Sequence, residues 1–469
     1  MQQPPPQRFP RAVPHLNVHP QRSRLITQTF DFIPADTLFC RDGRPLAAGS
    51  SFGRGAYWPL PTVLHSALRT GLLRAADCTP ERKQDGFIRR GQPTGAMGTD
   101  AFNWLHLHGP FPVRTDGPND NGTLYLPTPR DLVPGKADGQ RRPLEYLRVI
   151  SNRTGVNNLP EMLQATVASF APPSKAELPD WVAASFLTSY LSGGGLFAPE
   201  RLALWDTDHR IGVALEDATH TAASGQLFAA EHLRLRKDVR LRFTASTRPS
   251  HKPADGREGD RDVRALRQSL LQLGGEQRFG LILDAPTLKL PRVDLTGSLV
   301  KCLLLTPAIF AHGWRPGWIG DDGKVLLRIK PEGFDKQAHR RSRREDAVNY
   351  DRDKHTGRSI AATLVAACLG KPLPVGGWEL LHESESENGQ RYVTGGGKPA
   401  RLAVPAGSVF YFHCDSTEDA RNLAQVLHDR CRSDFFGEKG LGLGVCGTWQ
   451  HQSSTSPDVH ANNNSQTTN

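Results

Sequence analysis

The stretch RLAVPAGSVFYFHCDSTEDARNLAQVLHDRCRSDFFGEKGLGLGVCGTW, residues 401–449, carries the pattern that decides the fold. Its first part, residues 401–415, predicts two strands around a Pro-Ala-Gly turn. Ser416 stands at the position of a helix cap, and apolar residues on one face predict a helix over about 417–432. The glycine-rich end, residues 440–449, predicts a last strand. This region therefore contains a strand pair, a helix and a closing strand.

The same kinds of element recur toward the N-terminus. Residues 25–32 alternate as a strand does, and LPTVLHSALRTGLLR (60–74) has an apolar stripe at helical spacing. His65 and Arg69 lie outside that stripe, on the polar face of the expected helix. Further strands are expected over residues 210–215, 227–235, 279–284 and 299–305. Strand, helix, hairpin, helix and strand is the order of a ferredoxin-like βαββαβ unit, and the chain holds about two of them.

We therefore expect an α+β fold with two ferredoxin-like, RRM-like domains, over residues 25–293 and 294–449. Loop insertions are expected within them, and the polar ends, residues 1–24 and 450–469, are expected to be disordered because they can bury little apolar surface.

Composition limits the kinds of partner and the cellular location that we expect for this protein. The 469 residues carry a formal net charge of +10, which favours a polyanionic partner such as nucleic acid or an anionic membrane surface. The longest uncharged apolar run, residues 360–369, is about half of a membrane span, and no secretory signal is recognisable, so we expect a cytoplasmic protein without a membrane partner. The seven cysteines form no CxxC pair, which argues against a disulfide framework and a thiolate zinc site. A P-loop and a dinucleotide-binding GxGxxG fingerprint are both absent from the sequence.

The most specific local signal is the glycine-rich run over residues 437–447. Gly440, Gly442 and Gly444 could present unblocked amide groups to phosphates, with Lys439 adding charge. The glycines could also let the backbone run close to another chain. The alternative is an ordinary glycine-rich strand edge.

Two basic stretches are further candidates for RNA contact. In LRLRKDVRLRFT (233–244), strand alternation would put four arginines on one face, which suits RNA or an acidic partner but also a solvated surface strand. These arginines are Arg234, Arg236, Arg240 and Arg242. HRRSRR (339–344) contains Arg340 and Arg341, and its acidic neighbours allow an ordinary solvated loop as well as RNA contact.

The sequence offers little for catalysis or metal binding. His65 and Arg69 are one helical turn apart and could cleave RNA by general acid–base chemistry or only contact its phosphates. His106 and His108 alternate like strand residues, and no third ligand at metal spacing accompanies them. We expect no metal and no catalytic residue.

An ordered series of motifs from about residue 25 to residue 449 gives the sequence a family resemblance. The stretches are DTLFCRDGRPL (36–46), residues 60–74, HRIGVALEDATHTAASGQLFAAEHLRLR (209–236), LGGEQRFGLIL (273–283), LLLTPAIFAHGW (303–314), GKPLPVGGWELL (370–381), VPAGSVFYF (404–412) and GLGLGVCGTW (440–449). The chain resembles the RAMP superfamily of CRISPR proteins, and within it the subunit of type III-B (Cmr) effector complexes that holds the 5′ handle of the crRNA. Residues 79–150 and 248–262 match less clearly.

The resemblance implies two ferredoxin-like RAMP domains, no cofactor and no catalytic activity. Such a subunit grips the crRNA handle, contacts the large signalling subunit and the backbone RAMP subunits, and meets target RNA only indirectly. Carried over to this chain, it implies a glycine-rich loop at Gly440, Gly442 and Gly444, a basic group at Arg69, and a thumb-like hairpin over about 210–236. Two alternatives stay open: a metal-independent endoribonuclease of CRISPR repeats that uses His65, and a basic protein that assembles with acidic subunits.

Overall fold

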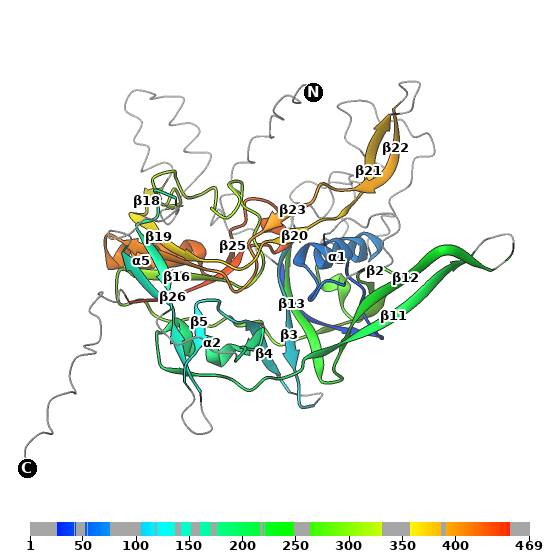
Figure 1. Ribbon diagram of the computed structural model, residues 1–469, viewed down its shortest axis with the longest axis horizontal. Helices are drawn as coiled ribbons and strands as arrows, with labels where there is room; N and C mark the ends of the chain where they lie inside the picture. The colour runs from blue at the N-terminus through cyan, green and yellow to red at the C-terminus, as the bar shows by residue number, and fades with distance from the viewer. Residues whose placement is uncertain are drawn as a thin grey trace, which may run out of the picture.

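The computed structural model describes residues 26–41, 43, 52–53, 55–75, 105–117, 120–136, 142–151, 160–169, 176–215, 219, 221–247, 263–330, 357–385 and 391–450. The fold is a mixed α/β structure that is rich in strands and has few helices in these ranges (Figure 1). The predicted disordered ends, residues 1–24 and 450–469, lie outside the described residues except for Gln450. No described helix is both long and apolar enough to cross a membrane.

The N-terminal sheet has seven strands in the order β14-β15-β1-β13-β3-β4-β9. Four of them form its centre, each antiparallel to its neighbours: β15 (Phe279–Asp284), β1 (Ile26–Pro34), β13 (Val239–Thr247) and β3 (His106–Arg114). Numbered by their order along the chain, these central strands have the spatial order 4-1-3-2.

Helix α1 (Pro61–Ala75) covers one face of this sheet, and the predicted apolar stripe is the face it buries. Pro61 stands in the first turn, where its missing N–H is not needed. Leu64 and Leu68 are fully buried and belong to the same apolar cluster as Phe30 and Phe243 of the sheet. Burial of these side chains stabilises the N-terminal unit by about 1.5–3 kcal/mol for each large residue.

The C-terminal sheet repeats this order of strands. Its members are β19 (Ala362–Cys368), β24 (Val409–Cys414), β16 (Leu299–Leu304), β26 (Leu443–Thr448) and β25 (Arg430–Cys431), in that spatial order and antiparallel throughout. Without β25, and read from β26 to β19, the strands numbered by their order along the chain again have the spatial order 4-1-3-2.

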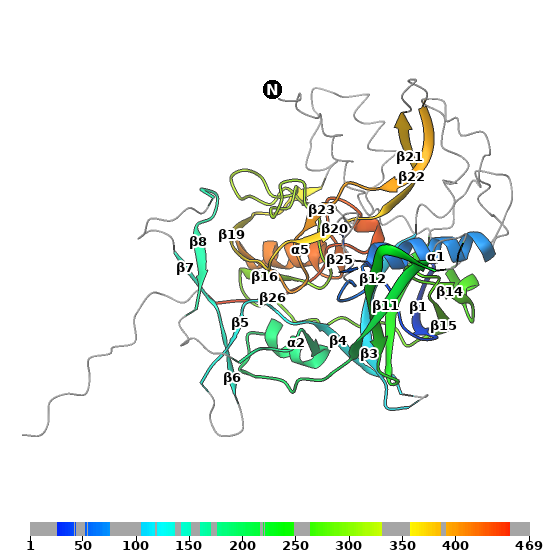
Figure 2. The ribbon, with the colours of Figure 1, turned by 45° about the vertical axis from the view of Figure 1, so that its right-hand side comes forward.

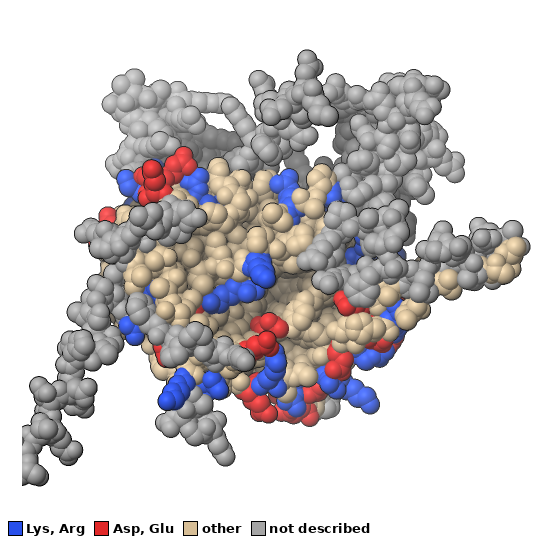
Figure 3. Space-filling model, viewed as in Figure 1, with Lys and Arg blue, Asp and Glu red and all other residues tan. Residues whose placement is uncertain are grey.

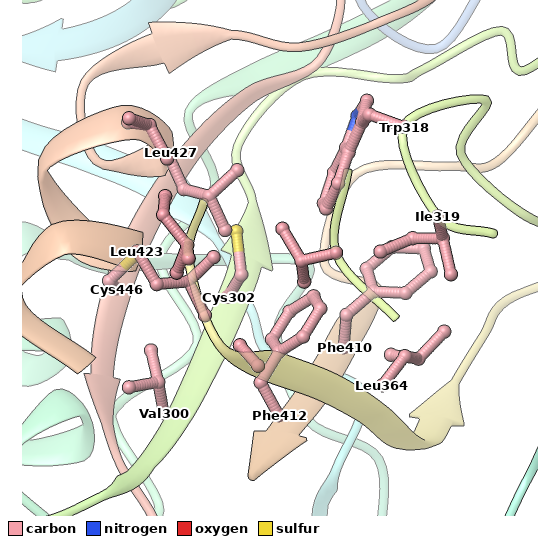
Figure 4. Packing of buried hydrophobic residues seen from close by; sticks show 14 of the residues in the cluster. Val300, Cys302, Trp318, Ile319, Leu364, Phe410, Phe412, Leu423, Leu427 and Cys446 are labelled. Atoms are coloured by element: carbon pink, nitrogen blue, oxygen red, sulfur yellow. The ribbon is translucent and has the colours of Figure 1, made fainter. Parts of the chain in front are cut away.

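Helix α5 (Thr417–Leu427) packs on this second sheet, and Figure 4 shows Leu423 and Leu427 directed toward Cys302 and Cys446. The predicted cap is confirmed, because the Ser416 hydroxyl accepts a hydrogen bond of 3.0 Å from the Asp419 amide. The helix ends at Leu427, earlier than predicted, since the chain turns there and enters β25. The two strands expected around the Pro-Ala-Gly turn are β23 and β24, which pair with different partners instead of with each other.

A long insertion between β3 and β13 connects the two sheets. It contains helix α2 (Ala184–Leu191), and a buried polar group joins it to the C-terminal sheet. Tyr190 and Tyr411 both donate hydrogen bonds to the buried Asp131 carboxylate, at 2.8 and 2.7 Å. The buried ammonium of Lys301 donates to the Tyr190 carbonyl at 2.9 Å and lies 3.5 Å from the centre of that ring. This network holds α2 against the C-terminal sheet. In Figures 1 and 2, α2 lies beside β26 of that sheet.

The insertion also forms a long hairpin that extends away from the rest of the molecule (Figure 1). Its strands, β11 (Trp205–Leu215) and β12 (Ala222–Leu235), pair from Trp205 opposite Leu235 outward. The predicted strand pair within residues 210–236 is therefore confirmed and is longer than expected. Ile211 is 75% exposed on this hairpin, so its apolar surface is open to a partner.

The remaining described elements are short. They are β2 (Phe52–Gly53), β4 (Thr123–Pro127), β5 (Leu132–Pro134), β6 (Pro143–Tyr146), β7 (Arg148–Ser151), β8 (Ala165–Ala168), β9 (Trp181–Ala183), β10 (Leu196–Phe197), η1 (Val263–Leu266), β14 (Leu270–Gln272), β17 (Arg328–Ile329), β18 (Arg358–Ser359), β20 (Leu373–Val375), β21 (Trp378–Glu385), β22 (Arg391–Gly397), β23 (Arg401–Ala403) and η2 (Gly437–Lys439). The predicted division after residue 293 falls in the connection between β15 and β16.

Candidate nucleic-acid interface

A cleft of about 910 Å³ opens between the two sheets. Its walls come from the segment before α1, from the insertion and from the C-terminal unit, and prolines and aromatic rings supply much of the lining. Figure 3 shows that the molecule is hollowed near the middle of this face, with basic and acidic side chains beside the hollow. Arg130, Asp180 and Glu231 are the charged residues of the lining.

Aromatic side chains form one wall of the cleft. Tyr57 is 59% exposed, and its ring centre lies 5.0 Å from that of Trp205. Trp58 lies 5.3 Å from Trp181 and 5.0 Å from Trp205, and its indole N–H donates to the Pro110 carbonyl at 2.9 Å. The ring cluster is therefore fixed in position before any ligand arrives, and its exposed member offers a surface on which a base can stack.

Hydrogen bonds orient the polar groups around this aromatic wall. The Tyr57 hydroxyl donates to the Asp180 carboxylate at 2.6 Å, and the Arg130 guanidinium donates to the Ala406 carbonyl at 3.3 Å. Arg130 thus stands beside the turn that leads into β24, with its positive charge facing the cleft residues. A cation beside an aromatic surface is the usual combination in sites for single-stranded nucleic acid.

A basic cluster lies where α1 meets the glycine-rich region, and it brings together two residues predicted from the sequence. Arg69 of α1 and Lys398 both lower the pKa of Lys439, while burial is the largest cause of that lowering and Glu438 opposes it. The Lys439 ammonium lies 4.6 Å from the centre of the Phe436 ring. Positive side chains that lower one another's pKa repel each other, and a bound anion would relieve this repulsion.

The glycine-rich loop itself is built differently from the prediction. Gly440 and Gly442 have φ values of +94° and +75°, and their amides donate within the chain, to Gly437 and Pro307 carbonyls at 3.0 and 2.8 Å. Gly444 is a buried residue of β26. The expectation that the Gly440 and Gly442 amides are unblocked is wrong, because the Gly440 amide closes a turn on Gly437 and the Gly442 amide donates to Pro307 from a distant segment. Backbones do approach closely here, since a Cβ on Gly442 would clash with the Ser433 backbone.

The four arginines of residues 233–244 do not share one exposed face. A turn after Arg236 separates β12 from β13, and the two strands belong to different sheets. Arg242 is buried and donates to both oxygens of Asp31, at 2.7 and 2.9 Å. The Arg240 guanidinium lies 3.8 Å from the same carboxylate. Asp31, far away in the sequence, therefore supplies the anion that the predicted strand lacked.

Arg234 and Arg236 are more exposed but are also paired. Arg234 donates to Asp36 at 2.9 Å and to Asp208 at 2.6 Å, and Arg236 donates to Asp206 at 2.8 Å. Their side chains are 46% and 50% exposed. Exposed pairs of this kind contribute about 0–1 kcal/mol each, so a phosphate could replace the carboxylate. RNA contact by these two residues stays a prediction.

His65 lies in the core and not on the polar face of α1 as expected. Its side chain is buried, and its Nε2 is 3.1 Å from the Leu105 carbonyl. Burial is the largest cause that lowers its pKa to about 4, and Lys439 and Arg69 lower it further. The ring is therefore neutral at physiological pH. Nε2 must carry the proton in order to donate to the carbonyl, so that nitrogen offers no lone pair to an RNA hydroxyl.

Two more residues predicted to contact RNA, Arg340 and Arg341, lie outside the described residues. Within the described ranges, no three His, Cys, Asp or Glu side chains are grouped so that they could hold a metal ion. The aromatic wall was not predicted. The adjacent aromatic residues Tyr57 and Trp58, directly before Pro59 and Pro61, were its local signal in the sequence.

Comparison with known proteins gives a family. The family model described as "CRISPR-associated protein (Cas_Cmr3)" matches residues 30–449. No curated protein matches the chain.

Solved structures are similar at low sequence identity. A chain of the type III-B Cmr-beta complex bound to cognate target RNA is 14% identical, with a TM-score of 0.37 and coverage of 89% of this chain and 95% of that chain. A chain of the same complex with AMPPnP is 12% identical, with a TM-score of 0.35 and coverages of 85% and 89%. A chain of the Csm3-Csm4 subcomplex of a type III-A complex is 11% identical, with a TM-score of 0.32 and coverages of 83% and 93%. Because the family model spans nearly all of the chain between its two ends, the chain belongs to the Cas_Cmr3 family of CRISPR-associated proteins, which are subunits of type III effector complexes.

Proposed function

We propose that this chain is a non-catalytic, RNA-binding subunit of a type III-B effector complex that holds the 5′ handle of the crRNA. The observation that carries the proposal is the cleft between the two sheets, which a fixed aromatic wall and Arg130 both line. The cluster of Arg69, Lys398 and Lys439 lies where α1 meets the glycine-rich region and adds positive charge there.

The two sheets support two ferredoxin-like RAMP domains, over residues 25–293 and 294–449. Each sheet has the antiparallel strand order 4-1-3-2, with α1 packed on the first and α5 on the second. In the first unit the position of the second helix is taken by the short turn η1, which packs against α1. A cleft at the junction of two such units can contact both the backbone and the bases of a single strand.

Single-stranded RNA suits this chemistry better than a duplex. Unstacked bases bind on aromatic side chains, and stacking contributes about 1–3 kcal/mol for each base. Phosphates bind to lysine and arginine with release of counterions, which makes affinity fall as salt rises. The exposed ring of Tyr57 offers the first kind of contact, and Arg69 and Lys439 offer the second.

Two further features support a binding role without chemistry. The protonated Nε2 of His65 is occupied by the Leu105 carbonyl, which disfavours the alternative of an endoribonuclease that uses this histidine. The hairpin of β11 and β12 carries exposed apolar residues and is long enough to reach beyond the body of the protein. It supports the proposed contacts with the large signalling subunit and the backbone subunits of the complex.

A gel assay on labelled repeat-derived RNA tests the proposal. The purified protein, alone and with its complex partners, is mixed in EDTA with the handle RNA or with a scrambled sequence. We expect handle-dependent binding with the RNA left intact. Cleavage at one site in the repeat would overturn the non-catalytic role, and equal binding of both sequences would overturn recognition of the handle.

Variants then locate the contact. Tyr57→Ala should weaken binding by about 5- to 150-fold, the equivalent of one lost stacking contact. Phe279→Ala is the matched control, because Phe279 is also an exposed ring, at 49%, but lies on β15 away from the cleft.

Arg69→Ala should lower the slope of log K against log salt by about 0.7 for the lost phosphate. Arg74→Ala, on the exposed end of the same helix, should leave the slope unchanged. Equal effects of Tyr57→Ala and Phe279→Ala would exclude the cleft, and equal effects of Arg69→Ala and Arg74→Ala would exclude the basic cluster.

A further inference from the structure

The lining of the cleft carries more negative than positive charge. Arg130 is its one cationic side chain among the described residues, whereas Asp180 and Glu231 both bring a carboxylate. Asp180 accepts a hydrogen bond from the Tyr57 hydroxyl, and Glu231 lies 3.9 Å from His209. In the part of the chain that the structure describes, neither carboxylate is ion-paired with a lysine or an arginine. A cationic occupant would therefore complement this lining, although the whole chain has a net charge of +10.

Aromatic rings and prolines stand beside these carboxylates. Tyr57, Trp58 and Trp181 line the cleft, and prolines from several segments surround them. Aromatic-lined grooves bind proline-rich segments in the polyproline II conformation, and the faces of such rings also bind guanidinium groups. A cleft that combines aromatic rings with carboxylates therefore suits a segment that contains both proline and arginine.

The chain itself contains a segment of this composition. MQQPPPQRFPRAVPH, residues 1–15, has three consecutive prolines and two further ones, together with Arg8 and Arg11. The first acidic residue of the chain is Asp31, so this segment is purely cationic. Consecutive prolines favour the polyproline II conformation, so such a segment loses less conformational entropy when it binds. The opposite end of the chain, residues 451–469, has one proline and neither lysine nor arginine, and does not match the cleft.

The segment is tethered close to the cleft. Ile26 begins β1, and Phe30 of the same strand pairs with Phe243 of β13. Pro110 of the cleft lining lies in the bulge of β3 opposite Phe243. Two strand spacings across the sheet and four residues along β1 separate Ile26 from Pro110, which places them about 16 Å apart. The stretch from Arg11 to Ile26 spans up to about 50 Å when extended, so it can reach the cleft without any change in β1.

We propose that residues 3–12 of this chain dock in the cleft. The prolines pack on the aromatic wall, and Arg8 and Arg11 point toward the two carboxylates of the lining. Because the segment is tethered, its effective concentration at the cleft is high, and weak individual contacts are sufficient. The docking itself needs no RNA. Its consequence, that handle RNA must displace the segment in order to enter the cleft, rests on the function proposed above.

Photo-cross-linking in the full chain tests the docking. Phe9→p-benzoylphenylalanine places a photoreactive ketone in the middle of the segment, and peptide mass spectrometry identifies the residues to which it becomes attached. We expect intramolecular cross-links to lining residues such as Tyr57, Pro179 and Trp181. Cross-links spread evenly over the surface would overturn the proposal. Covalent dimers would overturn it as well, because the segment would then dock on a second copy.

Charge variants in the segment separate docking from the chance encounters of a tethered chain. Arg8→Glu together with Arg11→Glu should lower the yield of cleft cross-links at least about fivefold, because the lining repels the new carboxylates. Arg22→Glu together with Arg24→Glu is the matched control, since it makes the same change in charge nearer to β1 and should leave the yield unchanged. Equal losses in the two variants would refute the docking.

Variants of the cleft test the same contact from the other side. Asp180→Asn together with Glu231→Gln should also lower the yield at least about fivefold. Glu177→Gln together with Glu200→Gln is the control, because both residues are exposed and neither lines the cleft. If the control lowers the yield as much as the cleft variant does, the carboxylates of the lining do not hold the segment.

Repeat-derived RNA distinguishes a failure of this inference from a failure of the proposed function. We expect the cleft cross-links to decrease in step with RNA binding. RNA binding by a protein that forms no cleft cross-links when free would overturn the docking and leave the proposed function standing. Cleft cross-links in a protein that binds no RNA would support the docking and refute the function. Cross-links that persist in the RNA complex would overturn the displacement.

Discussion

The buried ion pair between Asp31 and Arg242 gives a sharp test of how the N-terminal sheet is stabilised. The two residues are register partners on β1 and β13, and their side chains are 2% and 6% exposed. Arg242→Met leaves the Asp31 carboxylate buried without its bidentate partner. Asp31→Leu leaves the guanidinium buried with the Asn121 carbonyl, 2.6 Å away, as its remaining hydrogen-bond acceptor in the described contacts. The double variant removes both charges.

The expected costs follow from the burial. Breaking a buried pair by removing one partner costs about 3–5 kcal/mol, because the remaining charge stays out of water. Arg240 lies 3.8 Å from Asp31 and partly replaces the lost cation, so we expect the lower end, about 3 kcal/mol, for Arg242→Met. The double variant should fall within about 1 kcal/mol of the natural protein, since apolar side chains of similar size replace a pair whose desolvation offsets its attraction.

Calorimetric unfolding of the full chain measures these differences. For a cooperative unit of 150–250 residues, about 3 kcal/mol lowers the Tm by about 6–12 °C. Arg267→Met is the matched control: Arg267 pairs with Asp284 in the same sheet at 3.0 Å, but both side chains are nearly half exposed, and the cost should be below about 1 kcal/mol. If Arg242→Met costs no more than Arg267→Met, or if the double variant loses the sum of the two single losses, the assigned role of the buried pair is wrong.

Three other expectations can be checked with single variants. Burial lowers the pKa of Lys301 from 10.5 to about 8, against an opposing effect of Asp131, so the unfolded chain binds more protons between these values. Stability should therefore rise as pH goes from 8 to 10, and Tm measurements should show that Lys301→Met loses this rise. Gly442→Ala should cost about 3 kcal/mol or more in chemical denaturation, because φ is +75° and a Cβ would clash with backbone, whereas Gly313→Ala, at φ +73° with open space, should cost about 1 kcal/mol. The imidazole of His65 should not titrate between pH 5 and 8 when followed by NMR, and a midpoint near 6.5 would contradict its burial.

Local patterns were enough to predict most of the elements that repeat in both sheets, among them α1, α5, β1, β15, β16, β24 and β26, but not β19. The Ser416 cap and the apolar stripe of α1 depend on residues within a few positions of one another, and both are confirmed. Apart from its long hairpin, the strands of the insertion were not predicted, because they are two to five residues long and β4 finds its partner β9 far away in the chain. Helix α2 has eight residues and no side-chain cap, so nothing local marks its start.

Only part of the candidate site was predicted, because its residues come from segments that are far apart in the sequence. Arg69 and Lys439 were each recognisable as basic groups at an element's polar side, but only the folded chain shows that they act on one another. The aromatic wall combines Tyr57 and Trp58 with Trp181 and Trp205 from the insertion. Rings that meet from segments more than a hundred residues apart leave no pattern in the sequence.

The arginines of residues 233–244 show how charge should be weighed in such a chain. These arginines alternate along the chain, but Asp31 and three other aspartates neutralise them. The base of the hairpin and the sheet therefore offer a phosphate little of the chain's net charge of +10. Near the junction of the sheets, two cations pack against aromatic rings and not against carboxylates. Lys439 packs on Phe436, and the Arg401 guanidinium lies 4.1 Å from the Phe435 ring centre. A ring stabilises a cation without neutralising it, so an anion can bind there without first breaking an ion pair. If RNA binds this protein through its net charge, Lys439→Ala and Arg401→Ala should each reduce the salt dependence of binding more than Arg236→Ala does. A larger effect of Arg236→Ala would move the RNA path from the junction to the hairpin.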